Sequence, residues 1–150
     1  MIIGVVNGPN LGRLGRREPG VYGTATLDDI LADLRAWAEP RGIVLEAVQS
    51  NHEGALIDAL EAGEGRWAGA VLNAGALTHY AWALYDCVKS LSYPVVEVHM
   101  SNIYAREGFR AHSVLAPVVR GHIVGFGADS YRLGLVALVR LLGGDPDAGR

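Results

Sequence analysis

The sequence predicts an α/β fold in which helices cover both faces of a parallel β-sheet. Short runs rich in Val and Ile recur along the chain without polar alternation, and amphipathic helical stretches separate them. Continuous apolar runs of this kind are typical of strands that are buried on both faces of a parallel sheet. With right-handed crossovers, such a β-α repeat folds into a three-layer sandwich.

Five apolar runs are expected to form the strands of this sheet. They are Ile2–Val6, Ile43–Val48, Ala68–Leu72, Val95–Val98 and Val118–Val124. Five strands in a chain of 150 residues favour a flavodoxin-like strand order, 2-1-3-4-5, over a longer Rossmann sheet. The same length corresponds to one ordinary domain, so residues 1–150 are expected to form a single domain.

The clearest helical pattern lies in Leu27–Glu39, where apolar residues recur at the 3.6-residue period of a helix. Thr26 precedes this stretch as an expected N-cap, and Asp29 stands where it can complete a capping box. The other predicted helices are Ala55–Ala62, Thr78–Leu91 and Ser130–Leu142. Residues 143–150, which are mostly Gly, Asp and Pro, are expected to form a disordered tail.

Composition excludes several classes of protein. Apolar residues make up 50% of the chain, charged residues 19%, and the net charge is −3 with no block of Lys or Arg. Neither intrinsic disorder nor a nucleic-acid partner fits these values. The N terminus lacks a basic leader, and no apolar stretch approaches the roughly 20 residues that a membrane span needs. We therefore expect a cytoplasmic protein without a membrane partner, in which the single cysteine, Cys87, is a buried structural thiol.

Polar residues gather at the predicted carboxyl ends of the strands. Asn7 and Asn10 follow the first strand, Asn73 follows the third, and His99 and Ser101 follow the fourth. In open α/β sheets, ligands bind beyond these ends, where the strand order reverses between the first and third strands. The sequence therefore predicts a binding site at this edge of the sheet.

The first loop, residues 7–23, is much longer than the usual two to six residues or so of a βα connection. It carries a guanidinium, Arg17, and a phenol, Tyr22. A cation beside Tyr22 favours the phenolate, which would make this residue a base. The structural alternative is that Tyr22 packs and Arg17 is solvated. The glycines of the loop do not have the spacing of a phosphate-binding loop.

Glu97 and His99 point to the same face of a predicted strand. A buried carboxylate needs a partner, and the imidazole of His99 is the nearest one. Pairing with Glu97 would fix the tautomer of His99 and suit it to general-acid catalysis. The alternatives are a purely structural histidine, or a metal site shared with His79, for which the spacing matches no recognised ligand pattern.

Two further groups of side chains are candidates for substrate contact. Asn73 leaves a buried strand into a glycine-containing turn, where its amide can face a ligand, and His79 begins the next predicted helix. Asp86 lies two helical turns beyond His79, too far to touch it, so it is either solvated or serves a neighbouring subunit. Arg106 and Arg110 are four residues apart, so on a helix both would face one direction and form a fork for carboxylate or hydroxyl groups. The alternative is a pair of surface charges that Glu107 compensates locally. The isolated histidines expected to be structural are His52, His112 and His122.

Taken together, these residues resemble the type II 3-dehydroquinate dehydratases, which are flavodoxin-like enzymes of the shikimate and quinate pathways. The resemblance runs roughly from Ile2 to Leu142 and consists of several blocks in the same order. The blocks are Asn7–Leu11, Arg17–Pro19, Tyr22–Gly23, Gln49–Asn51, Glu53–Gly54, Asn73–Gly75, Thr78–His79, Glu97–His99, Ser101–Asn102, Arg106–Glu107, Phe109–Arg110 and Ser113.

The resemblance implies the trans-dehydration of 3-dehydroquinate to 3-dehydroshikimate through an enolate, without a metal, a cofactor or a Schiff base. Tyr22 would remove the proton alpha to the ketone, and Arg17 would favour its ionised form. Asn10 would hold the water or polar groups near the enolate. His99 would protonate the departing hydroxyl, and Glu97 would orient it.

The resemblance also implies a substrate-binding set and an assembly. The set consists of Asn73, His79, Asp86, Met100, Ser101 and Arg110, with Met100 and Ser101 acting through their backbone and Asp86 reaching in from an adjacent subunit. The expected partners are the small-molecule substrate and further copies of the chain, as trimers grouped into a dodecamer. Two residues of the helix Thr78–Leu91 depart from the family: Tyr85 stands where arginine is usual, and Ala81 where serine is common.

Two other functions fit parts of the pattern. A non-catalytic flavodoxin-like module that binds a nucleotide or flavin explains the long first loop, but not the combination of Arg17, Tyr22 and His99. A related lyase that acts on another cyclic hydroxy-ketone is the second. The single lysine, Lys89, lies in a predicted helix away from the strand ends, which disfavours an imine mechanism. The sequence leaves open whether the enzyme serves aromatic biosynthesis or quinate breakdown.

Overall fold

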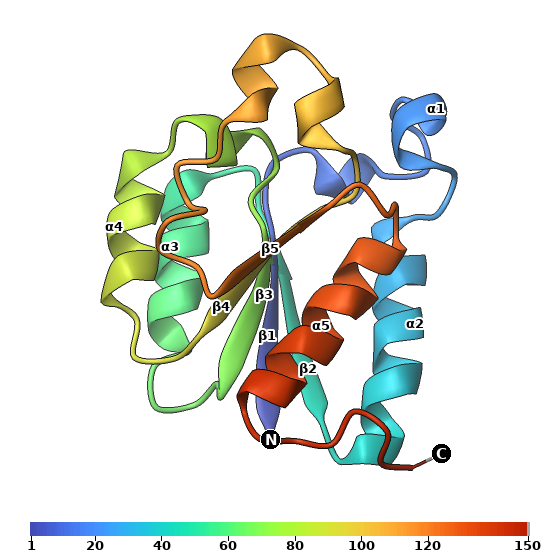
Figure 1. The fold of residues 1–150 in the computed structure, drawn as a ribbon, viewed down its shortest axis with the longest axis vertical. Helices are drawn as coiled ribbons and strands as arrows, with labels where there is room; N and C mark the ends of the chain where they lie inside the picture. Colours follow the sequence, from blue (N-terminus) through green and yellow to red (C-terminus); the bar gives the residue numbers. More distant parts are fainter. Residues whose placement is uncertain (150) are drawn as a thin grey trace.

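The computed structural model describes residues 1–149, and in it a parallel sheet lies between two layers of helices (Figure 1). Five strands form the sheet in the order β2-β1-β3-β4-β5, so the predicted fold class and strand order are confirmed. The strands are β1 (Ile2–Asn7), β2 (Val44–Gln49), β3 (Gly69–Asn73), β4 (Val95–His99) and β5 (Gly121–Val124).

Helices α2 and α5 pack on one face of the sheet, and α3 and α4 on the other (Figure 1). Their bounds are α2 (Leu27–Ala38), α3 (Glu53–Ala62), α4 (Trp82–Ser90) and α5 (Asp129–Leu141), and a short helix, α1 (Pro19–Tyr22), lies in the first loop. The predicted capping box is confirmed: Thr26 Oγ1 accepts from Asp29 N at 3.1 Å, and Asp29 Oδ2 accepts from Thr26 N at 2.9 Å. These two bonds satisfy backbone groups that the first turn of α2 leaves without helical partners.

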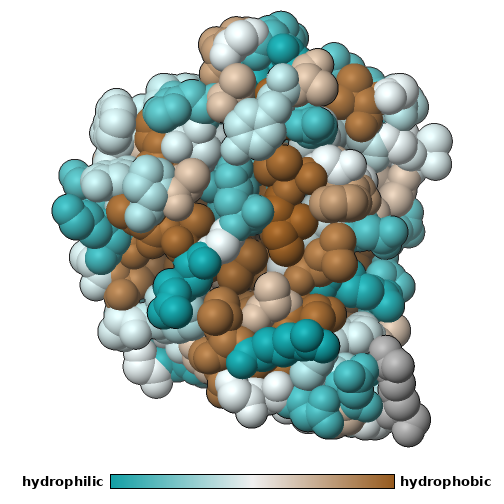
Figure 2. All heavy atoms as spheres, viewed as in Figure 1, coloured by the Kyte–Doolittle hydropathy of each residue, from teal (hydrophilic) through white to brown (hydrophobic). Residues whose placement is uncertain are grey.

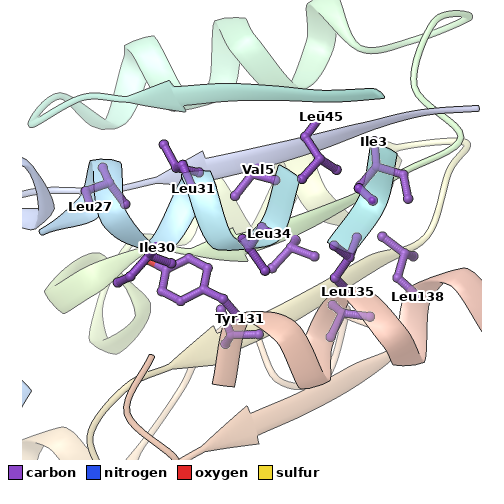
Figure 3. Close-up of a cluster of buried hydrophobic side chains, with 14 of the residues drawn as sticks. Ile3, Val5, Leu27, Ile30, Leu31, Leu34, Leu45, Tyr131, Leu135 and Leu138 are labelled. Atoms are coloured by element: carbon purple, nitrogen blue, oxygen red, sulfur yellow. The ribbon is translucent and has the colours of Figure 1, made fainter. Parts of the chain in front are cut away.

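Two apolar layers hold the sheet in place. Beneath α2 and α5, the side chains of Leu34, Tyr131 and Leu135 are almost completely buried against β1 (Figure 3). On the opposite face, Leu56 and Leu84 are fully buried. Burying each of the leucine side chains contributes about 1.5–3 kcal/mol, which makes the central strands a rigid support for whatever their ends carry.

The predicted helix Thr78–Leu91 is wrong in its first part. Gly75–His79 is instead a 3₁₀ helix, and α4 begins only at Trp82. The backbone carbonyl of Thr78 accepts from Val114 N at 2.7 Å, a contact from a distant loop that takes the place of a helical bond. The apolar spacing of the segment is compatible with a helix, but this long-range bond interrupts it.

The fifth strand also begins later than predicted. Val118 and Val119 both donate their backbone N–H to Leu115 O, at 2.9 and 3.2 Å, and so form a turn. The ladder with β4 starts at Gly121, which pairs with Val96. Because β5 is the last strand of the sheet, its outer edge borders a groove with α5, on the side of the molecule that Figure 2 presents.

The last described residues, 143–149, belong to the segment predicted to be a disordered tail. They form turns, and Arg41 Nε donates to Pro146 O at 2.8 Å. Arg150, the end of that segment, lies outside the described residues. Within residues 1–149, no helix combines the length and the apolar character required to cross a membrane.

Candidate active site

A cleft with about 490 Å³ of open space lies at the carboxyl ends of β1, β3 and β4, the edge at which the sequence predicts a site. Figure 1 shows α1 and the loop after β4 at this same end of the sheet. The predicted site residues that line the cleft are Asn10, Arg17, Tyr22, Asn73, His79, His99, Met100, Ser101 and Arg110. Of the remaining two, Glu97 is fully buried beside His99, and Asp86 is exposed on α4.

The phenol of Tyr22 contacts two guanidinium groups. Arg106 Nη1 donates to Tyr22 Oη at 2.8 Å, while Arg17 Cζ lies 5.1 Å from the centroid of the Tyr22 ring. Two guanidinium groups therefore lie against the phenol, one at its oxygen and one over its ring. The sequence placed Arg17 beside Tyr22, but the guanidinium that touches the oxygen belongs to Arg106, 84 residues away, which the sequence offered only as half of a fork with Arg110 and not as a partner of Tyr22.

The first loop is held against the strand ends by hydrogen bonds from its backbone to the side chains of Gln49 and Asn51, which lie at and just beyond the end of β2. Gln49 Nε2 donates to Gly8 O at 3.2 Å, and Asn51 Oδ1 accepts from Asn10 N at 3.0 Å. A Cβ atom on Gly8 would lie only 2.5 Å from the carbonyl oxygen of Ala74, so the close approach of this loop to the end of β3 requires glycine. These contacts place Asn10 at the mouth of the cleft.

The predicted pairing of Glu97 with His99 is present. His99 Nε2 donates to Glu97 Oε1 at 2.7 Å, and the same carboxylate accepts from Ser113 Oγ at 2.9 Å and from Thr78 Oγ1. Since a carboxylate can only accept, Nε2 of His99 carries a proton, and Nδ1 is the ring nitrogen left for exchange with a bound molecule. The pair therefore fixes both the ring orientation and the tautomer.

The Glu97 carboxyl group stays ionised despite its complete burial. Burial raises its pKa, but hydrogen bonds from His99 and Thr78, together with the charges of His99 and His122, outweigh that effect and lower the pKa below its usual value. His122 was expected to be an isolated structural histidine, yet its Nε2 lies 3.6 Å from Glu97 Oε2. No motif in the sequence links these two residues, because the contact arises from the pairing of β4 with β5.

Asn73 lines the cleft, but its amide is also engaged inside the protein. Its Nδ2 donates to Tyr131 Oη at 2.9 Å, its Oδ1 accepts from Gly75 N at 3.1 Å, and Tyr131 Oη donates to Asn7 Oδ1 at 2.7 Å. This buried chain joins the ends of β1 and β3 to α5. Tyr131 was missed at the sequence level, since nothing local distinguishes it from an apolar core residue.

His79 is held by the loop that precedes β5 and is separate from Glu97. Its Nδ1 donates to His112 O at 2.7 Å, and its ring packs edge-on against Phe109 with 6.2 Å between centroids. Burial lowers the pKa of His79, so near neutral pH its other nitrogen, Nε2, is an acceptor. The metal-site alternative that combined His79 with Glu97 and His99 therefore does not describe the observed cluster, in which the second histidine is His122.

Arg106 and Arg110 both line the cleft, although they do not share the helix on which the fork was considered. Two short 3₁₀ helices, Ile103–Ala105 and Gly108–Ala111, flank Arg106. Glu107 Oε2 accepts from Arg110 Nε at 3.0 Å and lies 3.7 Å from Arg106 Nε. The charge compensation considered as the alternative is thus present, and both guanidinium groups also face the cleft.

Helix α4 carries Asp86 between the half-buried Tyr85 and the exposed Lys89. Tyr85 packs edge-on against Trp82 with 5.7 Å between ring centroids, and Lys89 Nζ lies 5.9 Å from the centroid of Tyr85. Lys89 is therefore placed on the helix surface, where an imine with a bound substrate is not expected. Asp86 does not line the cleft of its own chain, so it can contribute to catalysis only at the cleft of a neighbouring chain that packs against α4.

Comparison with known proteins settles the family. The family model described as dehydroquinase class II matches residues 1–139. The chain belongs to the class II dehydroquinase family. It is 55% identical over 141 residues to the 3-dehydroquinate dehydratase of Bacillus subtilis, and the match covers 94% of this chain and 95% of that protein. The family resemblance inferred from the sequence is confirmed, and with it the assignment to the hydro-lyases.

Solved structures of class II dehydroquinases agree with this membership. The type II dehydroquinase of Butyrivibrio crossotus superposes with a TM-score of 0.90 at 39% identity, covering 96% of this chain and 98% of that one. The type II dehydroquinase of Propionibacterium acnes gives a TM-score of 0.87 at 42% identity, covering 95% of this chain and 96% of that one.

Proposed function

We propose that this class II dehydroquinase removes water from 3-dehydroquinate to form 3-dehydroshikimate, by proton abstraction next to the ketone followed by loss of a hydroxyl group. The observation that carries this proposal is the composition of a single cleft. It contains a phenol whose oxygen accepts from Arg106, and a histidine whose ring is fixed by the buried carboxylate of Glu97. One group can act as a base and the other as an acid, as a dehydration requires.

In the proposed reaction, the Tyr22 phenolate takes the proton alpha to the ketone and leaves an enolate. In this scheme Arg106 and Arg17 stabilise the phenolate before this step. We assign to Asn10, which lines the cleft, the stabilisation of the charge on the enolate oxygen. The imidazolium form of His99 then donates a proton from Nδ1 to the departing hydroxyl group. The ionised Glu97 stabilises that imidazolium through the bond to Nε2.

The remaining groups along the cleft support binding of a polyhydroxylated carboxylate. We assign the substrate carboxylate to the backbone of Met100 and Ser101 at the end of β4, and the ring hydroxyls to Asn73, His79 and Arg110. His79 Nε2 is an acceptor in this scheme, because Nδ1 donates to a backbone carbonyl.

The assembly and setting of the enzyme belong to the same proposal. We expect one catalytic domain per chain, trimers that group into a dodecamer, and a cytoplasmic location. In a trimer, Asp86 of a neighbouring chain would approach the cleft. An Asp86→Ala variant tests this directly: it should lower turnover without changing the mass of the assembly, and full activity would remove Asp86 from the site.

The activity is tested by ultraviolet absorbance after the protein is mixed with 3-dehydroquinate, in the presence and absence of a chelator and of borohydride. Appearance of the conjugated enone, unaffected by either reagent, is the expected result. A folded protein that forms no product, or one that is purified yellow or with a bound nucleotide, would contradict the proposal and favour a binding module. Faster turnover on another cyclic hydroxy-ketone would favour a related lyase.

His99→Ala removes the proposed acid and should therefore slow the step in which the hydroxyl group is lost.

A further inference from the structure

The carboxylate of Glu97 faces a second histidine that the proposed reaction does not use. His122 pairs with Glu97 across β4 and β5, so the two side chains are lateral neighbours on the same face of the sheet. His122 Nε2 lies 3.6 Å from Glu97 Oε2, and its ring meets that of His99 edge-on with 5.5 Å between centroids. Two imidazoles thus flank one buried carboxylate.

His122 has a buried nitrogen without a hydrogen-bond partner among the described residues. Its Nε2 is inaccessible to solvent and makes no hydrogen bond with the described residues 1–149, although 15% of the side chain remains exposed. Leaving such a group unsatisfied destabilises the folded protein, because the nitrogen has lost its hydrogen bonds to water without gaining others. A ligand that joined this nitrogen to Glu97 and His99 would remove that cost.

The three side chains have the geometry and chemistry of a metal-ion donor set. One ligand atom from each of Glu97, His99 and His122 lies within 4.8 Å of the other two. Two imidazoles and one carboxylate bind Zn²⁺ in proteins with bonds of about 2.0–2.2 Å, which places tetrahedral ligand atoms about 3.4 Å apart. The 2.7 Å pair of His99 Nε2 and Glu97 Oε1 must therefore open, and the longer separations in the cluster must shorten, to complete the coordination. Thr78 and Ser113 already orient the carboxylate by donating to it, as supporting residues of metal sites do.

We propose that Glu97, His99 and His122 form an inhibitory site for a divalent first-row transition ion, with Zn²⁺ as the ion that this donor set favours. The ion enters between His99 Nε2 and Glu97 and replaces their hydrogen bond. The proton on Nε2 moves to Nδ1, so the ring stays neutral and the proton count is unchanged. A metal-bound neutral imidazole is a weaker acid than the imidazolium, which is why binding inhibits the dehydration. This last step rests on the proposed function, whereas metal binding itself does not.

Binding is tested with the metal ion alone. Protein freed of metal by a chelator is titrated with Co²⁺ and followed by its visible absorption, and Zn²⁺ is then added to displace the Co²⁺. One ion per chain with the strong bands of a low-coordinate site is expected. His122→Gln should weaken binding at least about tenfold, because loss of a supporting group alone costs 10- to 100-fold in affinity. His52→Gln, a change at an exposed histidine, is the matched control and should bind as the unaltered protein does.

Inhibition is tested by adding Zn²⁺ to the assay and then removing it with a chelator. The unaltered enzyme should lose activity and recover it, and His122→Gln should keep full activity over at least a tenfold wider range of Zn²⁺. Equal inhibition of both proteins, or no Co²⁺ spectrum in the folded enzyme, would overturn the site. His122→Val provides a second variant if the glutamine destabilises β5. Co²⁺ binding that depends on His122 in a protein without any dehydratase activity would keep the site and refute the proposed function.

Discussion

The end of β4 and the first loop supply the two proposed proton-transfer groups of one cleft, but they hold them by different means. At β4, Glu97 is fully buried and accepts hydrogen bonds from three side chains, of His99, Thr78 and Ser113. In the loop, Tyr22 ends a four-residue helix, α1, in which no residue is fully buried. Its oxygen is reached by Arg106 from a different segment.

This difference indicates how each group is prepared for catalysis. The histidine is oriented by buried bonds that persist whether or not a substrate is present, so its geometry depends on the stability of the fold. The tyrosine depends on contacts between exposed segments, which open at lower free-energy cost. Changes on the loop side should therefore affect turnover without affecting stability, and changes among the buried polar groups should affect stability.

Tyr22→Phe should produce the largest effect on turnover. Removing the proposed base should lower kcat by about 10²- to 10⁴-fold, the usual contribution of acid–base catalysis. The melting temperature should stay the same, because the hydroxyl group contacts Arg106 at the surface of the cleft. Tyr104→Phe, which alters another exposed phenol, is the control. Near-normal kcat in Tyr22→Phe would remove this residue from the mechanism.

Arg106→Ala is the next largest expected effect. A hydrogen bond to a charged group contributes about 1.5–3 kcal/mol, so loss of the contact with the Tyr22 oxygen should lower kcat by roughly 10- to 100-fold. Arg17→Ala removes a cation that lies over the ring and does not contact the oxygen, and should also lower kcat. Steady-state rates over a range of pH measure both. A wild-type profile in Arg106→Ala would show that the contact has no catalytic role.

Tyr131→Phe tests the buried polar network. The hydroxyl group joins Asn73 to Asn7, so its removal takes away the hydrogen-bond partner of one buried amide nitrogen, Asn73 Nδ2, and of one buried amide oxygen, Asn7 Oδ1. We expect a loss of about 1–3 kcal/mol in the free energy of unfolding, measured by denaturant titration. Turnover per folded molecule should change less than in Arg106→Ala. A large loss of turnover without any loss of stability would contradict the contrast drawn between the two regions.

The smallest expected effect is a pH dependence of stability at His79. Burial in the folded protein lowers the pKa of His79 below 6.5, the ordinary value for histidine. As the pH falls through 6.5, the unfolded chain therefore binds more protons at this residue than the folded protein does, and stability decreases. His79→Gln should therefore lose less in melting temperature than the unaltered protein between about pH 7 and pH 5, the range in which histidine titrates. His52→Gln, at an exposed position, should behave as the unaltered protein does. Identical curves for all three proteins would show that His79 is not perturbed.

The amino-acid sequence by itself determined the strands, their order, the α2 cap and much of the cleft. Val- and Ile-rich runs, the spacing of Thr26 and Asp29, and the alternation that puts Glu97 and His99 on one face all involve residues close together in the chain. The unusual length of the first loop pointed to Tyr22 and Arg17. Such signals are readable because helix and strand periodicity acts over a few residues.

Only the tertiary structure decided which distant residues meet. Arg106 reaches Tyr22 over 84 positions, and Tyr131 reaches Asn7 over 124. The register of β4 against β5 places His122 beside Glu97, and a bond from Val114 N to Thr78 O interrupts the start of the helix that local spacing predicts, so that α4 begins only at Trp82. Sheet register and loop packing depend on contacts summed over the whole chain, so no local pattern encodes these pairs.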